Sequence, residues 1–94
     1  MAKLVDLPAG RQARLNMITV YAIKSLKRNY IYVGMTKDLT DRFSRHNKGY
    51  ERTTKPYSPF KLFYTERFKT RKEARAREKY LKSGAGKEFL KSLI

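Results

Sequence analysis

The stretch ITVYAIKSLKRNYIYVG, residues 18–34, decides the fold of this chain. Both of its ends are rich in β-branched and aromatic side chains, which favour strands. The segment between them, residues 25–29, is short and polar, so the two strands should form an antiparallel hairpin. We expect strands over residues 18–23 and 30–33, with Gly34 ending the second.

Alternation along the hairpin also predicts how the two strands pair. If Val20 pairs with Val33, the aliphatic side chains of both strands gather on one face of the sheet. The same register sets Tyr21 directly opposite Tyr32 on the other face, with Cβ atoms about 5 Å apart. A slip of one residue would mix the two sets of side chains, so we predict this register.

Beyond the hairpin, the pattern predicts a helix, a loop and a third strand. Asp38 is placed to cap the helix, and Gly49 is placed to end it. Residues 50–59 are polar and contain two prolines, as is typical of a loop. Residues 60–65 then return to alternating aromatic and polar side chains, which favour a strand.

Two further helices are expected in the last third of the chain. Thr70 and Glu73 form a capping box that opens a helix ending at about Lys82. The glycines that follow should break it, and a short last helix should begin at about Lys87. Three of its side chains are expected to pack onto the body: Phe89, Leu90 and Leu93. The order is β-β-α-β-α-α, an α/β (α+β) fold in which a small three-stranded antiparallel sheet is flanked by helices.

Length and composition narrow the class of protein. The 94 residues suit one small domain, which we assign to residues 17–94, preceded by a flexible tail over 1–16. There is no cysteine, which excludes disulfides, a thiolate metal site and a thiol nucleophile. No apolar run approaches the roughly 20 residues of a membrane span, and no secretory signal is recognisable. We therefore expect a soluble cytoplasmic protein that does not bind membranes.

The charge points to a polyanionic partner. The chain has 23 Lys+Arg against 8 Asp+Glu, a formal net charge of +15. Such an excess favours phosphate contacts through counterion release, so we expect DNA as the partner, with RNA remaining open. A basic surface that only maintains solubility, or that meets an acidic protein, fits the same composition, and no protein partner can be named. The expected backbone contacts are Lys55, Arg71, Lys72 and Arg75.

Paired tyrosines on one sheet face offer a way to activate water. Tyr21 and Tyr32 carry phenols whose ordinary pKa is about 10, which is too high for a base unless cations lower it. The many lysines and arginines of this chain are a source of such a field. The structural alternative is that both rings simply pack, with their hydroxyls at the rim of the sheet.

Arg42 and His46 lie one turn apart on the first predicted helix. The guanidinium of Arg42 can hold a phosphate with two hydrogen bonds, or it can pair with Asp38 four residues earlier. His46 is the only histidine. It can relay a proton from attacking water, or it can be an incidental surface residue.

Glu78 is the most informative carboxylate. In the second predicted helix it shares a stripe with Ala74 and Leu81, where an acid is costly unless it is paired or binds a metal. A pair with Lys82 at i,i+4 is the structural alternative. A single carboxylate can hold Mg²⁺ together with waters and a substrate phosphate, which is usual for that ion.

Taken in order, these residues resemble the GIY-YIG nuclease superfamily, and more narrowly its small stand-alone single-domain branch. The matching motifs are Thr19-Val20-Tyr21, Tyr32-Val33-Gly34, Asp38-Leu39-x-x-Arg42, His46 and Glu78, which together cover about residues 17–82. The resemblance implies that Tyr21 and Tyr32 take part in activating water, that Arg42 binds the scissile phosphate, and that His46 lies beside the nucleophile. It makes Glu78 the ligand of one divalent ion, Mg²⁺ or Mn²⁺.

We therefore predict a metal-dependent endonuclease that hydrolyses phosphodiester bonds in DNA, with structure-specific or repair-related cleavage among its expected roles. The alternative is a non-catalytic, basic nucleic-acid-binding module. Dependence of function on metal and on Glu78 separates the two.

Overall fold

Three strands form one antiparallel sheet in the order β2-β1-β3. The computed structural model describes residues 17–94, and the tail predicted for 1–16 lies outside the described residues. The strands are β1 (Ile18–Ser25), β2 (Ile31–Thr36) and β3 (Phe60–Phe68). The helices are α2 (Leu39–Asn47), the short 3-10 helix η1 (Lys55–Tyr57), α3 (Arg71–Leu81) and α4 (Gly84–Lys91). The predicted fold class and element order are confirmed.

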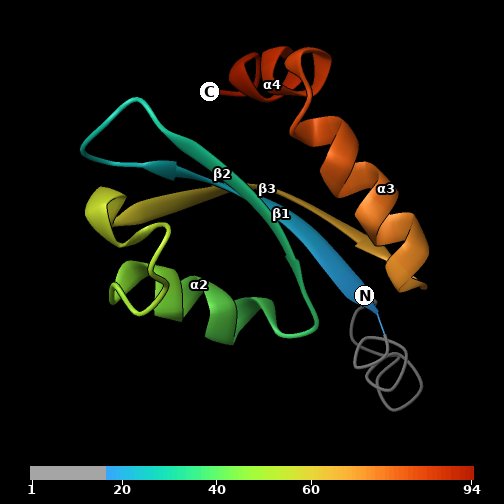
Figure 1. Ribbon diagram of the computed structural model, residues 1–94, viewed down its shortest axis with the longest axis horizontal. Helices are drawn as coiled ribbons and strands as arrows, with labels where there is room; N and C mark the ends of the chain where they lie inside the picture. The colour runs from blue at the N-terminus through green and yellow to red at the C-terminus, as the bar shows by residue number, and fades with distance from the viewer. Residues whose placement is uncertain (1–16) are drawn as a thin grey trace, which may run out of the picture.

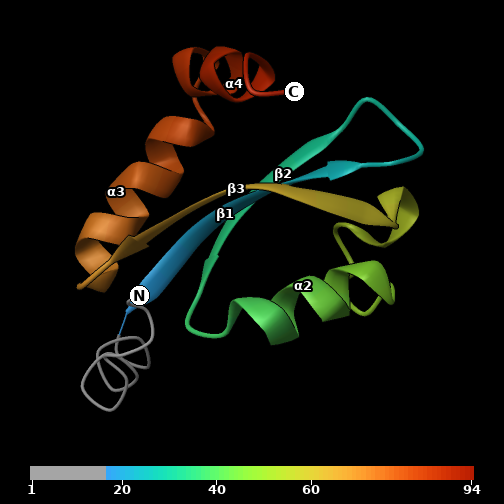
Figure 2. The same cartoon turned by 180° about the vertical axis from the view of Figure 1, so that it is seen from behind.

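The helices cover both faces of the sheet and create two cores. Figures 1 and 2 show α2 on one face of the twisted sheet, with α3 and α4 on the other. On the α3 side, aliphatic residues of β1 and β2 (Val20, Ala22 and Val33) pack against residues of α3 and α4 (Ala74, Leu81 and Leu90). On the α2 side the core is smaller and more aromatic: Tyr21, Ile23 and Phe60 are buried against Tyr32, Leu39 and Phe43. The central strand β1 therefore has no solvent-facing side.

The predicted pairing of the hairpin was wrong by two residues. Tyr21 lies opposite Gly34, and Tyr32 lies opposite Ile23. A shift of two leaves every side chain on its predicted face, so the hydrophobic pattern could not detect it. The turn decides instead, because Ser25 Oγ accepts hydrogen bonds from the backbone N–H groups of Lys27 and Arg28 at 3.1 and 3.0 Å. These bonds hold a longer loop than a tight hairpin would have.

Gly34 does not end β2, as had been predicted, but lies inside it. The strand continues to Thr36, and the ring of Tyr21 lies across the glycine. A Cβ at this position would stand 2.6 Å from Tyr21 Oη and 2.9 Å from a ring carbon of Tyr32. The glycine is required by this close approach rather than by a turn.

Helix ends follow their predicted caps except at the last helix. Asp38 caps α2 by accepting from the N–H of Asp41, and Thr70 caps α3. The expected start of α4 at about Lys87 was too late, since Ser83 caps a helix that begins at Gly84. Gly86 is buried against the end of α3, where a side chain would overlap the backbone of Leu81.

The last helix is only partly docked. Leu90 is fully buried, as predicted, whereas Leu93 is 46% exposed and does not join the core. Phe89 is also partly exposed and lies edge-on to Tyr64, with ring centroids 5.9 Å apart. Within residues 17–94, no helix is both long and apolar enough to cross a membrane.

Candidate active site

The aromatic core beneath α2 brings together three of the predicted site residues. Tyr21 Oη and His46 Nε2 are 2.8 Å apart, and both side chains are almost completely buried. The ring of Tyr32 lies 5.0 Å from that of His46 and 6.2 Å from that of Tyr21, measured between centroids. Tyr21 and Tyr32 thus share a face, as predicted. His46 is not an incidental surface residue.

A threonine from the loop fixes the other side of the imidazole. Thr54 Oγ1 lies 2.8 Å from His46 Nδ1 and donates its hydrogen to the carbonyl oxygen of Glu51 at 3.4 Å. A carbonyl can only accept, so this long contact favours the tautomer in which the threonine oxygen accepts from an N–H at Nδ1. Nε2 of the neutral ring is then an acceptor, and Tyr21 donates to it. The hydrogen bonds run in one direction from Tyr21 through His46 and Thr54.

Burial keeps both titratable groups of this hydrogen-bonded network, the Tyr21 phenol and the His46 imidazole, neutral. It raises the pKa of Tyr21 above its ordinary value of 10, and the neighbouring Tyr32 adds to that rise. Arg42 acts in the opposite direction but does not outweigh burial. Burial also lowers the pKa of His46 below its ordinary 6.5. The expectation that surrounding cations would depress the tyrosine pKa was therefore wrong for Tyr21, because removal from water is the larger effect.

Arg42 stands beside this network with an unfilled hydrogen-bonding position. Its Nε lies 3.5 Å from a carboxylate oxygen of Glu51, while Arg45 Nε donates to the same oxygen at 2.8 Å. Arg42 Nε is buried and is without a hydrogen-bond partner in the part of the chain that is described. The alternative pairing with Asp38 is not found, since that side chain caps the helix. The hydrogen bond from Arg45 lowers the pKa of Glu51, which stays ionised.

Glu78 lies apart from the tyrosine–histidine network. It projects from α3, which packs on the opposite face of the sheet, and its side chain is 18% exposed. Its carboxylate pairs with Lys82 Nζ at 3.2 Å, the structural alternative considered above. Lys82 also lines a pocket that Tyr32 borders at the edge of β2, whereas Glu78 is not among the residues that line it.

The protein groups around Glu78 supply only part of the ligand set that a divalent ion needs. One carboxylate offers a hard oxygen ligand, and Lys82 is half exposed and free to turn away. Residues 17–94 contain no group of three His, Cys, Asp or Glu side chains close enough to hold a metal. An ion bound here would take its other ligands from water and a substrate phosphate, as Mg²⁺ commonly does.

Four cations predicted to touch the nucleic-acid backbone lie outside the network. They are exposed on the first turns of α3 and on the loop: Arg71, Lys72, Arg75 and Lys55. Their role remains a prediction.

Two residues of the site were missed in the sequence, Thr54 and Glu51. Both lie in the loop between α2 and β3, where no periodicity indicates which side chains turn inward. Glu51 is the one acid between residues 50 and 59, and that isolation was the only available signal.

Comparison with known proteins agrees with this arrangement. Residues 17–90 match the family described as the GIY-YIG catalytic domain. The chain belongs to the GIY-YIG family. A UPF0213 protein of Clostridium perfringens is 39% identical over 64 residues, covering 67% of this chain and 68% of the relative. A UPF0213 protein of Staphylococcus saprophyticus is 36% identical over 73 residues, covering 77% and 88%. No solved structure matches this chain.

Membership in the GIY-YIG family gives the coarse function. The matched family is one of nuclease catalytic domains, and membership in it implies an activity on nucleic acid. Nucleases of the family are generally dependent on a divalent metal. The match spans both tyrosine motifs, α2 and α3, and hence all five predicted catalytic and metal-binding positions.

Proposed function

We propose that this GIY-YIG domain is a metal-dependent endonuclease that hydrolyses phosphodiester bonds in DNA. The observation that carries the proposal is the chain of hydrogen bonds that joins Tyr21, His46 and Thr54, with the partly exposed guanidinium of Arg42 beside it. A packing core has no need of such an arrangement. Buried polar groups that relay hydrogen bonds next to a cationic side chain are typical of a reaction site.

The tyrosine and the histidine together can remove a proton from water. As water attacks phosphorus, Tyr21 Oη accepts its proton while the phenol proton passes to His46 Nε2 across the 2.8 Å bond. The P–O bond to water forms, the P–O bond to the leaving oxygen breaks, and the leaving oxygen takes a proton from solvent. No free tyrosinate is formed, so the raised pKa of Tyr21 does not block the step. Glu51 favours the imidazolium that results.

Arg42 and Tyr32 hold the phosphate. The Arg42 side chain is 39% exposed, so its guanidinium can donate to a non-bridging oxygen, and its permanent charge offsets the negative charge that develops at phosphorus. Glu51 orients the guanidinium from 3.5 Å without a hydrogen bond to its Nε. Tyr32 is less buried than Tyr21 and borders the pocket along β2, where its hydroxyl can meet the substrate.

Glu78 is the proposed metal ligand. A divalent ion bound there, Mg²⁺ or Mn²⁺, would supply positive charge to the leaving oxygen. For that to happen, Lys82 must release the carboxylate from its present ion pair. The half-exposed lysine can do so at little cost, because exposed ion pairs contribute little to stability.

The choice of DNA rests on charge, and the shape of the substrate is left to experiment. The formal charge of +15 and the exposed cations of α3 favour a long polyanion. Branched, flapped or damaged strands of the kind that arise in repair are the proposed substrates.

The test is cleavage of a labelled panel of duplex, branched and single-stranded DNA in Mg²⁺, Mn²⁺ or EDTA. Wild type should cut only with metal. Glu78→Gln should abolish cutting and leave DNA affinity equal or higher, since one negative charge is lost. Glu73→Gln is the matched control, because it removes the same charge from an exposed site on the same helix.

Each alternative outcome has a distinct meaning. No cutting of any substrate by wild type, with equal DNA binding by all variants, would favour the non-catalytic binding module. Equal cutting by wild type and Glu78→Gln would remove Glu78 from the metal site. An RNA panel run beside the DNA decides between the two nucleic acids.

A further inference from the structure

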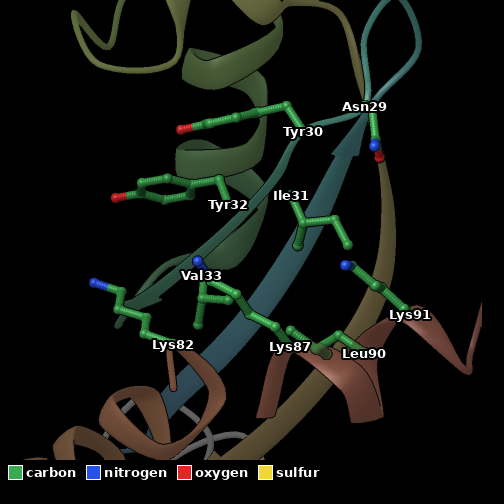
Figure 3. A pocket seen from close by; sticks show the side chains of 9 residues that line it. All are labelled: Asn29, Tyr30, Ile31, Tyr32, Val33, Lys82, Lys87, Leu90 and Lys91. Carbon is green, nitrogen blue, oxygen red and sulfur yellow. The ribbon is translucent and has the colours of Figure 1, made fainter. Parts of the chain in front are cut away.

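A pocket of about 480 Å³ runs along the free edge of β2, between that strand and α4. Figure 3 shows three lysine side chains reaching toward the strand from the helical side, while two tyrosines project together from the strand. The lining residues that matter here are Tyr30, Ile31, Tyr32, Lys82, Lys87 and Lys91. Neither Lys87 nor Lys91 was among the cations predicted to contact nucleic acid.

The pocket combines an aromatic side with a cationic side. Tyr30 is held rigidly, because its ring stacks on Tyr57 with centroids 3.8 Å apart and planes within 9°. Ile31 points to the other face of β2, where its partly buried side chain lies toward Lys91 (Figure 3). Lys87 and Lys91 project from one face of α4 at i,i+4, and both are exposed. Aromatic platforms beside a positive groove are how proteins bind unpaired nucleic-acid strands.

We infer that this pocket binds an unpaired nucleotide of the substrate strand, next to the phosphate that is cut. Its base lies against Tyr30, and its phosphates meet Lys87 and Lys91. Tyr32 links the two sites, since it borders the pocket and also lies 5.0 Å from the ring of His46. The inference rests on the proposed function for the identity of the cut strand, but the binding site stands on its own contacts.

An unpaired nucleotide fits this pocket better than a duplex does. A duplex presents phosphates to lysines but keeps its bases within the stack, so it would leave the aromatic side uncovered. A base that is already unstacked reaches the rings without the cost of flipping. The pocket therefore predicts a preference for flaps, gaps or single strands over continuous duplex.

The test is direct binding in EDTA, where no metal-dependent cleavage takes place. Fluorescence anisotropy compares a labelled ten-residue thymidine strand with an abasic strand of equal length and with a short hairpin duplex. The proteins are wild type, the double variant Lys87→Gln/Lys91→Gln, and the matched control Lys61→Gln/Lys69→Gln, which loses the same charge from exposed positions on and after β3. All four positions are exposed, so folding should be preserved.

The pocket variant should bind the thymidine strand about tenfold more weakly than the control does. Its slope of log affinity against log salt should fall by about 1.4, because each phosphate contact on a single strand contributes about 0.7. Wild type should prefer the thymidine strand to the abasic one, and Tyr30→Leu should erase that preference. Equal affinities of the two double variants, or equal binding of thymidine and abasic strands by wild type, would overturn the inference.

The result is separable from the nuclease proposal. Pocket-dependent binding without cleavage in the earlier experiment would overturn only the nuclease. Metal-dependent cleavage with binding that ignores Lys87 and Lys91 would overturn only the pocket.

Discussion

Replacing Thr54 by valine removes the hydroxyl that accepts from His46 Nδ1 while keeping the size and branching of the side chain. Thr54 is fully buried, so neither water nor a new cavity complicates the change. The Nδ1–H is left in a buried position without the partner that it has at 2.8 Å. The ring loses the contact that selects its tautomer.

The expected cost follows from that single unpaired donor. A buried N–H without a partner costs about 1–3 kcal/mol. For a domain of this size each kcal/mol lowers Tm by about 4–8 °C, so a loss near the middle of that range lowers it by roughly 8–16 °C. Thr54→Ser keeps the oxygen and should recover most of this loss. Cleavage should fall in Thr54→Val, because a ring free to carry its proton on Nε2 cannot accept from Tyr21.

The assay is nitrogen NMR of the imidazole together with thermal unfolding. His46 is the only histidine of the chain, so its two ring nitrogens are assigned without ambiguity. Wild type at neutral pH should show a protonated Nδ1 and an unprotonated Nε2. A wild-type ring protonated on Nε2 would refute the directed chain, and so would a Thr54→Val protein with unchanged Tm and unchanged ring signals.

Three other perturbations follow from the same geometry. Gly34→Ala should destabilise the fold by about 1–3 kcal/mol and reduce cleavage, because its Cβ would stand 2.6 Å from Tyr21 Oη; urea unfolding and a cleavage assay measure the two effects. The free energy of unfolding should fall as pH drops below about 6.5, because the unfolded state then binds a proton at His46 while the folded state, with its lowered pKa, does not. Denaturant titrations of His46→Gln should lack this loss of stability. A second loss of stability, below about pH 4.5 and caused by Glu51, should persist in that variant. Cleavage should decline only at lower pH, as His46 of the folded protein becomes protonated through its lowered pKa, and should stay level up to about pH 9, because the pKa of Tyr21 is raised above 10; a rate that climbs between pH 7 and 9 would indicate a tyrosinate base instead.

The faces of the strands were predictable, whereas the pairing between strands was not. Side chains alternate with a period of two, so Val20 and Tyr21 had to lie on opposite faces in any register. The register itself depends on loop length, which the side chain of Ser25 sets through hydrogen bonds to the turn. No hydrophobic pattern contains that information. Because the register was not known, the sequence did not show that Tyr21 lies opposite Gly34 and leaves no room for a side chain there.

The site divides in a similar way. Tyr21, Arg42 and His46 lie on regular elements, and spacing placed Arg42 and His46 one turn apart, but only the resemblance to the GIY-YIG family implied that they meet Tyr21. Glu51 and Thr54 come from a loop, and only the folded loop shows that one orients Arg42 and the other His46. The direction of the shift in the Tyr21 pKa could not be predicted from the sequence either, because it depends on how much water the packed sheet excludes.

The position of Tyr21 ties activity to stability. It belongs to the central strand and is the largest fully buried side chain of the described residues, so it packs the smaller core while its hydroxyl serves the reaction. A tyrosine at this depth cannot ionise cheaply, and His46 cannot charge cheaply either. A transfer in which the phenol gains one proton as it gives up another leaves Tyr21 neutral throughout, and places the new positive charge on the ring nearest Glu51. Burial thus opposes a stepwise route through tyrosinate, and the charge of Glu51 offsets part of the cost of the imidazolium. The pairing of Tyr21 with His46, rather than either residue alone, is therefore the unit of catalysis proposed for this domain.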